Sequence, residues 1–294
     1  MKHSLRTLRA FKAESKPLTW LTCYDFSFAS VLEETELDLI LVGDSGGMVS
    51  LGYLDTIPVT MDEMISMASS VRRGAPNKFI VGDLPKGSYE VSNEVAVNNA
   101  MRFMKESGCD AVKLEGGERV SERILALTSS GIPVIGHLGL TPQSSSLLGG
   151  YRVVGRSDSE IEDLKNSMKS IQDSGAFAVL LEAVPPKLAL ELSKASSLIT
   201  FGIGAGPSVD GQLLILHDLL GLFPTFRPKF AKCFIPQALV KYSSDNQYNI
   251  NAKGSLSDFK PIDGLWEISR IAVEIYINET RNRIFPDHEF SYKD

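Results

Sequence analysis

Eight short apolar runs, separated by longer segments with helical spacing, dominate the sequence. Runs that are apolar at nearly every position predict strands buried on both faces, and their alternation with helices predicts a parallel sheet. Eight such strands favour a closed (β/α)8 barrel, or TIM barrel, in the α/β class. The predicted strands are Leu18 to Tyr24, Leu37 to Gly43, Lys78 to Gly82, Asp110 to Leu114, Ile132 to Gly136, Phe177 to Leu181, Leu198 to Ile203 and a weaker run at Leu213 to Leu216.

A doubly wound open sheet is the alternative architecture. Polar residues follow nearly every predicted strand, whereas an open sheet concentrates its site at one switch point, so the closed barrel is favoured. The chain has 294 residues, of which 43% are hydrophobic. Because barrels of this kind commonly occupy about 250 residues as one unit, we predict a single domain over residues 1–294.

Four segments between the predicted strands have the apolar spacing of helices, and three of them begin with residues that commonly cap helices. The capping residues are Thr60, Ser92 and Ser157. The predicted helices are Met61 to Arg73, Ser92 to Ser107, Glu118 to Ser129 and Asp158 to Ser174.

The last third of the chain follows a different pattern. Residues 233–260 are polar and rich in Asn, Ser and Tyr, which predicts an irregular insertion or lid. Residues 262–284 regain helical periodicity and predict a terminal helix. An apolar stripe on this helix must be covered by the barrel or by a neighbouring subunit, so we expect a homo-oligomer. The stripe consists of Leu265, Ile268, Ile271, Ala272 and Ile275.

Two strand ends carry an isolated carboxylate. Asp44 ends the run Leu-Val-Gly-Asp, and Asp83 ends the run Val-Gly-Asp. If the strands belong to one barrel, the two side chains converge at its carboxyl end, where oxygen ligands suit a hard cation such as Mg²⁺. Both residues could instead be helix N-caps or turn residues, as Asp after a strand often is.

Further ionisable residues follow the next three strands. Lys113 and Glu115 lie two apart and therefore on the same face of a strand. They can act in a site or simply neutralise each other. His137 directly follows an apolar run and can be a core histidine, while Glu182 leaves a buried strand as a candidate general base or acid. Together with the two aspartates, these residues predict a metal, a substrate contact and a proton acceptor around one mouth.

Composition excludes several other classes of function. The formal net charge of −6 is spread along the chain without a basic stripe, so we expect no nucleic-acid partner. No apolar stretch approaches the ~20 residues of a membrane span, and no signal-peptide core is present, so we expect a soluble, cytoplasmic protein without a membrane partner. The cysteines, which are odd in number and far apart, predict structural thiols: Cys23, Cys109 and Cys233.

Nine separated sequence blocks closely resemble ketopantoate hydroxymethyltransferases. The resemblance covers about residues 1–235 in matching order, with a weaker match at 285–292. The blocks are Cys-Tyr-Asp at 23–25, Leu-Val-Gly-Asp-Ser at 41–45, Pro-Val-Thr at 58–60, Val-Arg-Arg-Gly-Ala-Pro at 71–76, Lys-Leu-Glu-Gly-Gly at 113–117, Gly-His-Leu-Gly-Leu-Thr-Pro-Gln-Ser at 136–144, Gly-Gly-Tyr at 149–151, Gly-Ile-Gly-Ala-Gly at 202–206 and Pro-Lys-Phe-Ala-Lys at 228–232.

This resemblance implies a barrel of the phosphoenolpyruvate/pyruvate type with a Mg²⁺ site. It also implies transfer of a hydroxymethyl group from the co-substrate 5,10-methylenetetrahydrofolate to the keto acid 3-methyl-2-oxobutanoate, through a Mg²⁺-stabilised enolate. The product is 2-dehydropantoate (ketopantoate), and the step is the first of pantothenate biosynthesis. The family further suggests that the homo-oligomer is a decamer.

The resemblance also implies a role for each residue that matches the family's motifs. Asp44 and Asp83 match the metal ligands, which also contact the substrate, and Glu115 matches a carboxylate that reaches the metal through water. Ser45 matches the residue that holds the substrate carboxylate. The remaining matches are Lys113 and His137, as further substrate contacts, and Glu182, as the catalytic base.

Two alternative functions remain at this point, and one departure from the family pattern bears on the co-substrate. The chain could be another Mg²⁺-dependent, enolate-forming lyase of the same superfamily, or a non-enzymatic paralogue that binds a keto acid. A lyase would need a second cationic clamp and a reactive loop cysteine, neither of which is evident. Lys86 stands where the family often has Phe, and it either binds the folate tail or faces solvent.

Overall fold

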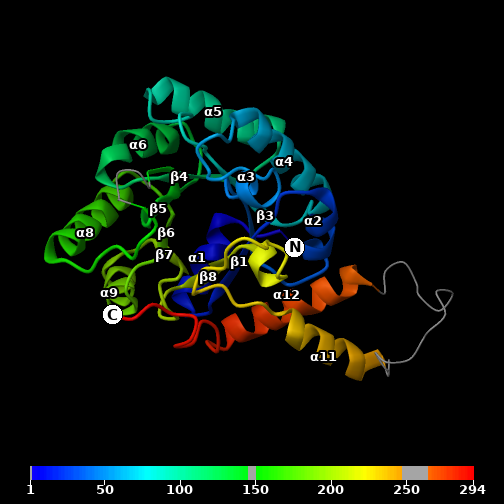
Figure 1. Ribbon diagram of the computed structural model, residues 1–294. Coiled ribbons are helices and arrows are strands. Elements are labelled where there is room, and N and C mark those ends of the chain that lie inside the picture. Colours follow the sequence, from blue (N-terminus) through cyan, green and yellow to red (C-terminus); the bar gives the residue numbers. More distant parts are fainter. Residues whose placement is uncertain (1, 145–149, 247–263) are drawn as a thin grey trace.

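The computed structural model describes residues 2–144, 150–246 and 264–294. Eight parallel strands close into a barrel in sequential order, which confirms the predicted TIM barrel (Figure 1). Nearly every strand residue is buried, because the barrel interior covers one face and the surrounding helices cover the other. The strands are β1 (Leu18–Thr22), β2 (Leu39–Val42), β3 (Phe79–Asp83), β4 (Ala111–Glu115), β5 (Val134–Gly139), β6 (Ala178–Glu182), β7 (Ile199–Ile203) and β8 (Gly211–Leu214).

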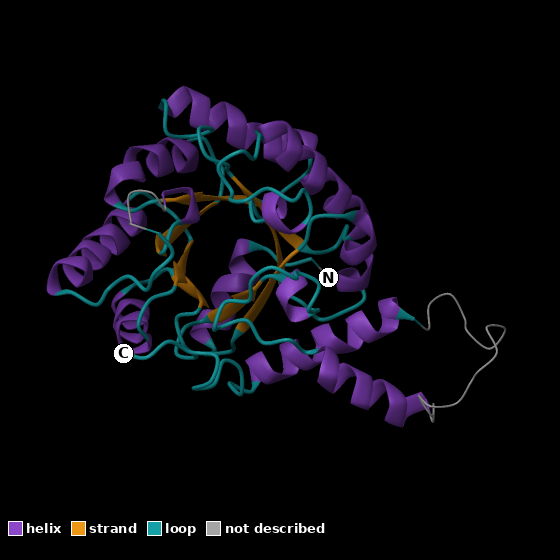
Figure 2. Ribbon diagram, in the orientation of Figure 1, coloured by secondary structure: helices purple, strands orange, loops and turns teal. Residues whose placement is uncertain are grey.

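Helices form the outer layer of the molecule (Figure 2). None of the described helices is both long enough and apolar enough to cross a membrane. They are α1 (Leu5–Ala13), α2 (Phe26–Glu33), α3 (Gly46–Val49), α4 (Met61–Gly74), α5 (Asn93–Glu106), α6 (Ser121–Ser129), α8 (Asp158–Asp173), α9 (Pro186–Ala195), α10 (Leu216–Leu219), α11 (Ile235–Asn246) and α12 (Leu265–Arg281), with 3-10 turns η1 (Glu118–Val120) and η2 (Pro142–Ser144).

The three predicted helix caps are confirmed. The side chains of Thr60, Ser92 and Ser157 accept hydrogen bonds from backbone N–H groups in the first turns of α4, α5 and α8. In α4 and α8, Glu63 and Glu160 complete a reciprocal capping box. Each cap satisfies donors that a helix start otherwise leaves unpaired, so these helix starts are fixed by local sequence.

The prediction of an irregular segment over 233–260 is wrong for its first half. Residues 235–246 form α11, while 247–260 lie outside the described residues. Ile235, Ala238, Leu239 and Tyr242 recur at helical spacing, and Ala238 is fully buried where α11 contacts α12. These four apolar residues are surrounded by polar ones, so the composition of the whole segment did not indicate a helix. Pro236 does not interfere, because the first turn of a helix tolerates proline.

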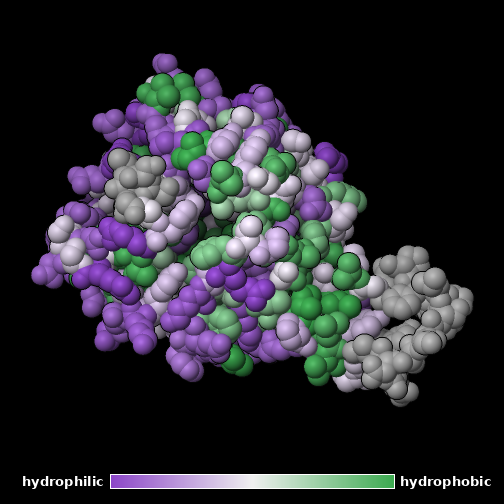
Figure 3. All heavy atoms as spheres, in the orientation of Figure 1, coloured by the Kyte–Doolittle hydropathy of each residue, from purple (hydrophilic) through white to green (hydrophobic). Residues whose placement is uncertain are grey.

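The terminal helix α12 covers the barrel beside β1 and α2. Ile271 and Ala272 of the predicted stripe are buried. Tyr276 Oη donates a hydrogen bond to the Gln212 carbonyl at 2.7 Å and lies 3.1 Å from the Trp20 carbonyl. Leu265, in contrast, is 81% exposed. Figure 3 shows apolar surface where α11 and α12 lie, and Leu239 and Val240 contribute to it. The barrel therefore covers part of the stripe, and assembly into a homo-oligomer stays a prediction.

A buried ion pair fixes the end of α12 to the amino-terminal end of the barrel. Arg281 Nη2 lies 2.7 and 2.6 Å from the two carboxylate oxygens of Asp38, which is 1% exposed. Asp38 also accepts hydrogen bonds from the backbone N–H and the hydroxyl of Thr19. Burial alone would raise the pKa of Asp38, but its contacts with His3 and Arg281 outweigh that effect and lower it.

We expect Arg281→Met to lower the free energy of unfolding by about 3–5 kcal/mol, the usual cost of leaving a buried charge unpaired. Arg102→Met, which removes exposed ion pairs with Asp62 and Glu106, should cost at most about 1 kcal/mol. Because folding lowers the pKa of Asp38, its contribution is present above the unfolded pKa of about 4 and is lost as the pH falls further. Denaturant titrations at pH 7 and pH 3 should therefore show the difference between Arg281→Met and wild type shrinking at pH 3.

Candidate active site

The predicted site residues converge at the carboxyl end of the barrel. Five consecutive strands, β2 to β6, end at or beside them, and strand register places Asp83 opposite Lys113 and Glu115 opposite His137. Neither Asp44 nor Asp83 caps a helix. The Asp44 carboxylate accepts a hydrogen bond from Gln143, and the Asp83 carboxylate accepts one from the backbone N–H of Asp44. The interpretation of these aspartates as helix caps is therefore wrong, whereas the alternative of a turn residue holds for Asp44, which lies in the turn after β2.

Lys113 lies at the centre of this cluster. Its Nζ is 2.6 Å from Asp83 Oδ1, 3.5 Å from His137 Nδ1 and 4.0 Å from Glu115 Oε1. Burial disfavours the charged ammonium, but the charges of Asp83 and Glu115 outweigh it and raise the pKa of Lys113 above its usual range. Lys113 is thus a fixed cation, and its main partner is Asp83 rather than its strand neighbour Glu115.

His137 lies between two carboxylates. Its Nδ1 is 3.3 Å from Glu115 Oε1, and its Nε2 is 3.2 Å from Glu182 Oε2. Burial and the charge of Lys113 oppose protonation, yet the contacts with Glu115 and Glu182 prevail and raise the pKa of His137 to about 9. Burial would likewise raise the pKa of Glu115, but the same contact with His137 lowers it. A protonated His137 cannot accept a further proton.

The backbone around Glu182 is tightly fixed. Glu182 ends β6, and its carbonyl accepts a hydrogen bond from the N–H of Leu140. The next residue, Ala183, has a φ of +49°, which is uncommon for a residue other than glycine. Its N–H donates to the Ile203 carbonyl and its carbonyl accepts from Val154. These contacts on three sides hold the strand end where the Glu182 side chain reaches His137.

Two residues that the sequence did not single out connect the cluster. Gln143 Nε2 donates to Asp44 Oδ2 at 2.9 Å, and the Gln143 backbone N–H donates to Glu115 Oε2 at 3.0 Å. Tyr89 Oη donates to Gln143 Oε1 at 2.8 Å and lies 3.2 Å from the Glu115 carbonyl. Because its oxygen accepts from Tyr89, the Gln143 amide must present its NH₂ group to Asp44. Gln143 lies within the 136–144 block, which was a signal for its importance.

Ser45 stands apart from this network. Its hydroxyl lies 2.9 Å from Tyr24 Oη, and within the described residues no hydrogen bond or ion pair joins its side chain to the other predicted site residues. Ser45 directly follows Asp44 and precedes α3. It therefore lines the same strand end, and its contact with a substrate carboxylate stays a prediction.

The charges of the cluster fit a divalent cation. Four carboxylates, those of Asp44, Asp83, Glu115 and Glu182, face one ammonium group and one imidazole. Burial, followed by the charges of Asp83 and Glu115, raises the pKa of Asp44 well above its usual range. The carboxylate form of Asp44 thus lacks compensating positive charge, which Mg²⁺ would supply. In the described ranges, no three Asp, Glu, His or Cys side chains converge closely enough to hold a metal ion by themselves. A Mg²⁺ site usually needs only one or two carboxylates, with waters and substrate as the other ligands.

Comparison with protein families and curated proteins gives consistent matches. A family model described as "Ketopantoate hydroxymethyltransferase" matches residues 2–255. The chain is 48% identical over 252 residues to 3-methyl-2-oxobutanoate hydroxymethyltransferase from Alkaliphilus metalliredigens, which covers 86% of this chain and 89% of the relative. It is 42% identical over 291 residues to the protein of the same name from Syntrophus aciditrophicus, covering 99% and 97%.

Solved structures share the architecture at low identity. Phosphoenolpyruvate phosphomutase from Streptomyces platensis subsp. rosaceus superposes with a TM-score of 0.60 at 16% identity, covering 95% of this chain and 99% of that one. A 2,3-dimethylmalate lyase, described as a PEP mutase/isocitrate lyase superfamily member, gives a TM-score of 0.56 at 15% identity, covering 94% and 99%. These likenesses concern the fold alone, and they agree with the barrel type implied by the sequence.

Proposed function

Because the chain belongs to the ketopantoate hydroxymethyltransferase family, we propose that it is a 3-methyl-2-oxobutanoate hydroxymethyltransferase. It transfers a hydroxymethyl group from 5,10-methylenetetrahydrofolate to 3-methyl-2-oxobutanoate and yields 2-dehydropantoate, the first step of pantothenate biosynthesis. One observation carries this proposal beyond family membership. The six ionisable residues that match site residues of the family all lie in one cluster at the ends of β2 to β6. They are Asp44, Asp83, Lys113, Glu115, His137 and Glu182.

Asp44 and Asp83 are the residues that would hold Mg²⁺, with Glu115 reaching it through water. The proposal is supported by their burial and by the excess of carboxylates over cations in the cluster. When bound, Mg²⁺ acts as a Lewis acid that draws electron density from the keto group and makes the adjacent C–H more acidic. The Lys113 ammonium would remain beside Asp83 and contribute positive charge toward the substrate.

Glu182 removes the proton from C3 of the keto acid in this proposal. Its side chain is 16% exposed, whereas that of His137 beside it is 2% exposed, so the Glu182 carboxylate is open to a substrate entering the mouth. His137, held as a cation by its two carboxylate neighbours, orients Glu182 and contacts the substrate. The methylene carbon of the folate is bonded to two nitrogens, and one of these bonds breaks as C3 of the keto acid forms a bond to that carbon. Water then supplies the hydroxyl group as the second carbon–nitrogen bond breaks. The two nitrogens take up the proton removed from C3 and one proton from water, and tetrahydrofolate leaves.

The first experiment separates proton removal from one-carbon transfer. We expect the purified protein with Mg²⁺ to exchange the C3 proton of 3-methyl-2-oxobutanoate with D₂O, followed by NMR, in the absence of folate. Chelation of Mg²⁺ should stop the exchange. Subsequent addition of 5,10-methylenetetrahydrofolate to the Mg²⁺-loaded protein should give 2-dehydropantoate. A protein that neither exchanges the proton nor forms this product would contradict the proposal.

The enolate-forming lyase is not favoured by any feature of the site. Such an enzyme was expected to need a reactive loop cysteine, yet Cys23 and Cys109 are buried, and the half-buried Cys233 is not part of the cluster. Burial raises the pKa of both thiols, to about 12 for Cys23 and about 11 for Cys109. Thiols in this state are poor nucleophiles. The presence of Asp44, Asp83 and Glu182 also argues against a degenerate binding protein, because such a protein would have no need of a proton acceptor.

We expect Gln143→Met to weaken Mg²⁺ binding by about 10- to 100-fold, the usual cost of removing a group that orients a metal ligand. Methionine keeps the volume of the side chain but cannot donate to Asp44. Isothermal titration of Mg²⁺ into the variant provides the measurement. Gln172→Met is a matched control, because Gln172 bonds to Ser196 and Ser197 on another part of the barrel. Equal Mg²⁺ affinity in Gln143→Met and wild type would show that Gln143 does not position Asp44.

A further inference from the structure

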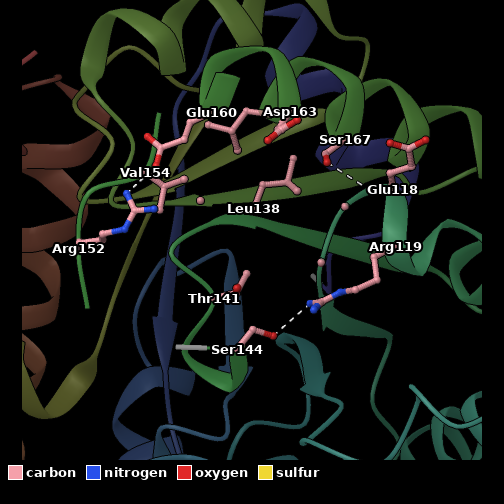
Figure 4. Close-up of a pocket in the computed structure, with 14 residues that line it drawn as sticks. Glu118, Arg119, Leu138, Thr141, Ser144, Arg152, Val154, Glu160, Asp163 and Ser167 are labelled. Carbon is pink, nitrogen blue, oxygen red and sulfur yellow. Dashed lines mark hydrogen bonds and ion pairs between the residues drawn. The ribbon is translucent and has the colours of Figure 1, made fainter. Parts of the chain in front are cut away.

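A cavity of about 420 Å³ lies at the ends of β4 and β5 (Figure 4). Its walls continue the strands that carry the site: Gly116 follows Glu115, and Leu138 and Gly139 follow His137. Gly139 pairs with Glu182 in the strand register, and a Cβ at Gly139 would lie 2.2 Å from the Glu182 carbonyl oxygen. Gly139 is thus the wall residue that lies beside the backbone of Glu182, the residue proposed to remove the substrate proton.

The size and chemistry of this cavity suit a large, amphipathic ligand. Cavities for ligands of several hundred daltons commonly measure about 300–1,000 Å³, and a keto acid with a five-carbon skeleton does not need this space. Leu138, Val154 and Leu164 supply apolar wall that is at most 7% exposed. The acidic side chains of the wall are those of Glu118, Glu160 and Asp163, the last two on α8, and Arg119 lies beside Ser144 (Figure 4). This mixture suits a ligand with apolar, N–H and carboxylate parts rather than a simple anion.

Arg119 is the cation that such a ligand can use. Its Nη2 donates to Ser144 Oγ at 3.1 Å, and no carboxylate pairs with it among the residues that the structure describes. Arg152, also on the cavity wall, differs because it pairs with Glu160 at 2.6 Å. Gly116 leaves room for the guanidinium, since a Cβ there would lie 3.3 Å from Arg119 Nη2. Arg119 therefore has N–H donors left for a carboxylate, which it can bind in a bidentate manner.

We propose that this cavity binds the folate co-substrate, with Arg119 holding a carboxylate of its glutamate tail. The inference rests on the proposed function and adds a location for the one-carbon donor. The aminobenzoyl part then lies along Leu138, Val154 and Leu164, and the methylene carbon approaches the keto acid past Gly139 and Glu182. Lys86, the other cation considered for the tail, instead forms an ion pair with Glu90 at 3.0 Å.

The test compares two methylene donors, one derived from tetrahydrofolate and one from tetrahydropteroate, which lacks the glutamate. In wild type we expect removal of the glutamate to raise the donor KM by about 10- to 100-fold, as for the loss of a charge-assisted hydrogen bond. Arg119→Gln should raise the KM for the complete donor by the same factor and give equal KM values for the two donors. Arg119→Lys should recover part of the discrimination, because it keeps the charge but not the bidentate geometry.

The controls separate this proposal from the proposed function. Exchange of the C3 proton without folate reports the state of the keto-acid site in each variant, and circular dichroism reports folding. Arg73→Gln alters an exposed arginine at the end of α4 and should leave both KM values at wild-type levels. If wild type transfers the one-carbon unit with equal KM for both donors, or if Arg119→Gln still discriminates between them, the cavity assignment is wrong. If wild type transfers it from neither donor, the proposed function fails as well.

Discussion

Replacing Glu182 by glutamine is expected to slow exchange of the C3 proton of 3-methyl-2-oxobutanoate by about 10²- to 10⁴-fold, the usual contribution of a general base. Glutamine preserves the volume of the side chain and can still contact His137, but its amide cannot accept a proton. The carboxylate lies 3.2 Å from His137 Nε2 at the open side of the cluster. Proton exchange followed by NMR in D₂O measures the effect directly, without the folate step.

Glu182→Gln should keep its fold, its affinity for Mg²⁺ and its affinity for the keto acid, because Glu182 is not among the expected metal ligands. Isothermal titration and thermal unfolding check these properties. Glu191→Gln alters an exposed carboxylate on α9 and serves as a matched control with wild-type exchange. A Glu182→Gln variant that exchanges the proton at the wild-type rate would place the base elsewhere.

The strand ends were predictable because their chemistry is local. Each apolar run ends at or near a polar residue, and the carboxyl ends of all strands in a barrel face the same mouth. Asp44, Asp83, Glu115, His137 and Glu182 could therefore be placed together before any pairing was known. The helix caps at Thr60, Ser92 and Ser157 were predictable for a similar reason, since a cap involves residues only a few positions apart.

Pairing within the cluster could not be predicted from sequence. The spacing of Lys113 and Glu115 left open whether they neutralise each other, and Lys113 Nζ lies 2.6 Å from Asp83 but 4.0 Å from Glu115. Alternation along a strand gives the face of a side chain but not its rotamer or its nearest partner on the next strand. The links from Gln143 to Asp44 and from Tyr89 to Gln143 depend on the paths of two loops, and those paths follow from tertiary packing.

The first half of the 233–260 segment was missed for another reason. Its helix, α11, has one short apolar face that is stabilised by contact with α12, a helix that follows later in the chain. Helical stability in proteins comes mostly from such packing rather than from intrinsic propensity. The segment is rich in Ser and Asn, and this composition argued against a helix. Contact with α12 nevertheless stabilises one.

Asp44 offers the clearest test of the metal proposal. Asp83 already pairs with Lys113 at 2.6 Å, so its replacement would also leave a buried ammonium without its main partner. Asp44 instead accepts its side-chain hydrogen bond from the neutral amide of Gln143. Removal of Asp44 therefore changes the cation site while disturbing fewer buried charges, and Asp44→Asn provides a second variant of nearly the same volume.

We expect Asp44→Ala to reduce turnover by about 10³-fold or more, since electrostatic groups at the reacting centre commonly contribute about 10²–10³ each and this one would also hold the metal. Mg²⁺ affinity measured by isothermal titration should fall in both Asp44→Ala and Asp44→Asn. Asp62→Ala, at a carboxylate whose side chain is 85% exposed, should bind Mg²⁺ as wild type does. Undiminished Mg²⁺ affinity in both Asp44 variants would overturn the assignment of Asp44 as a metal ligand, whatever their activity. If affinity falls while proton exchange continues at the wild-type rate, Mg²⁺ binds at Asp44 but does not assist removal of the proton.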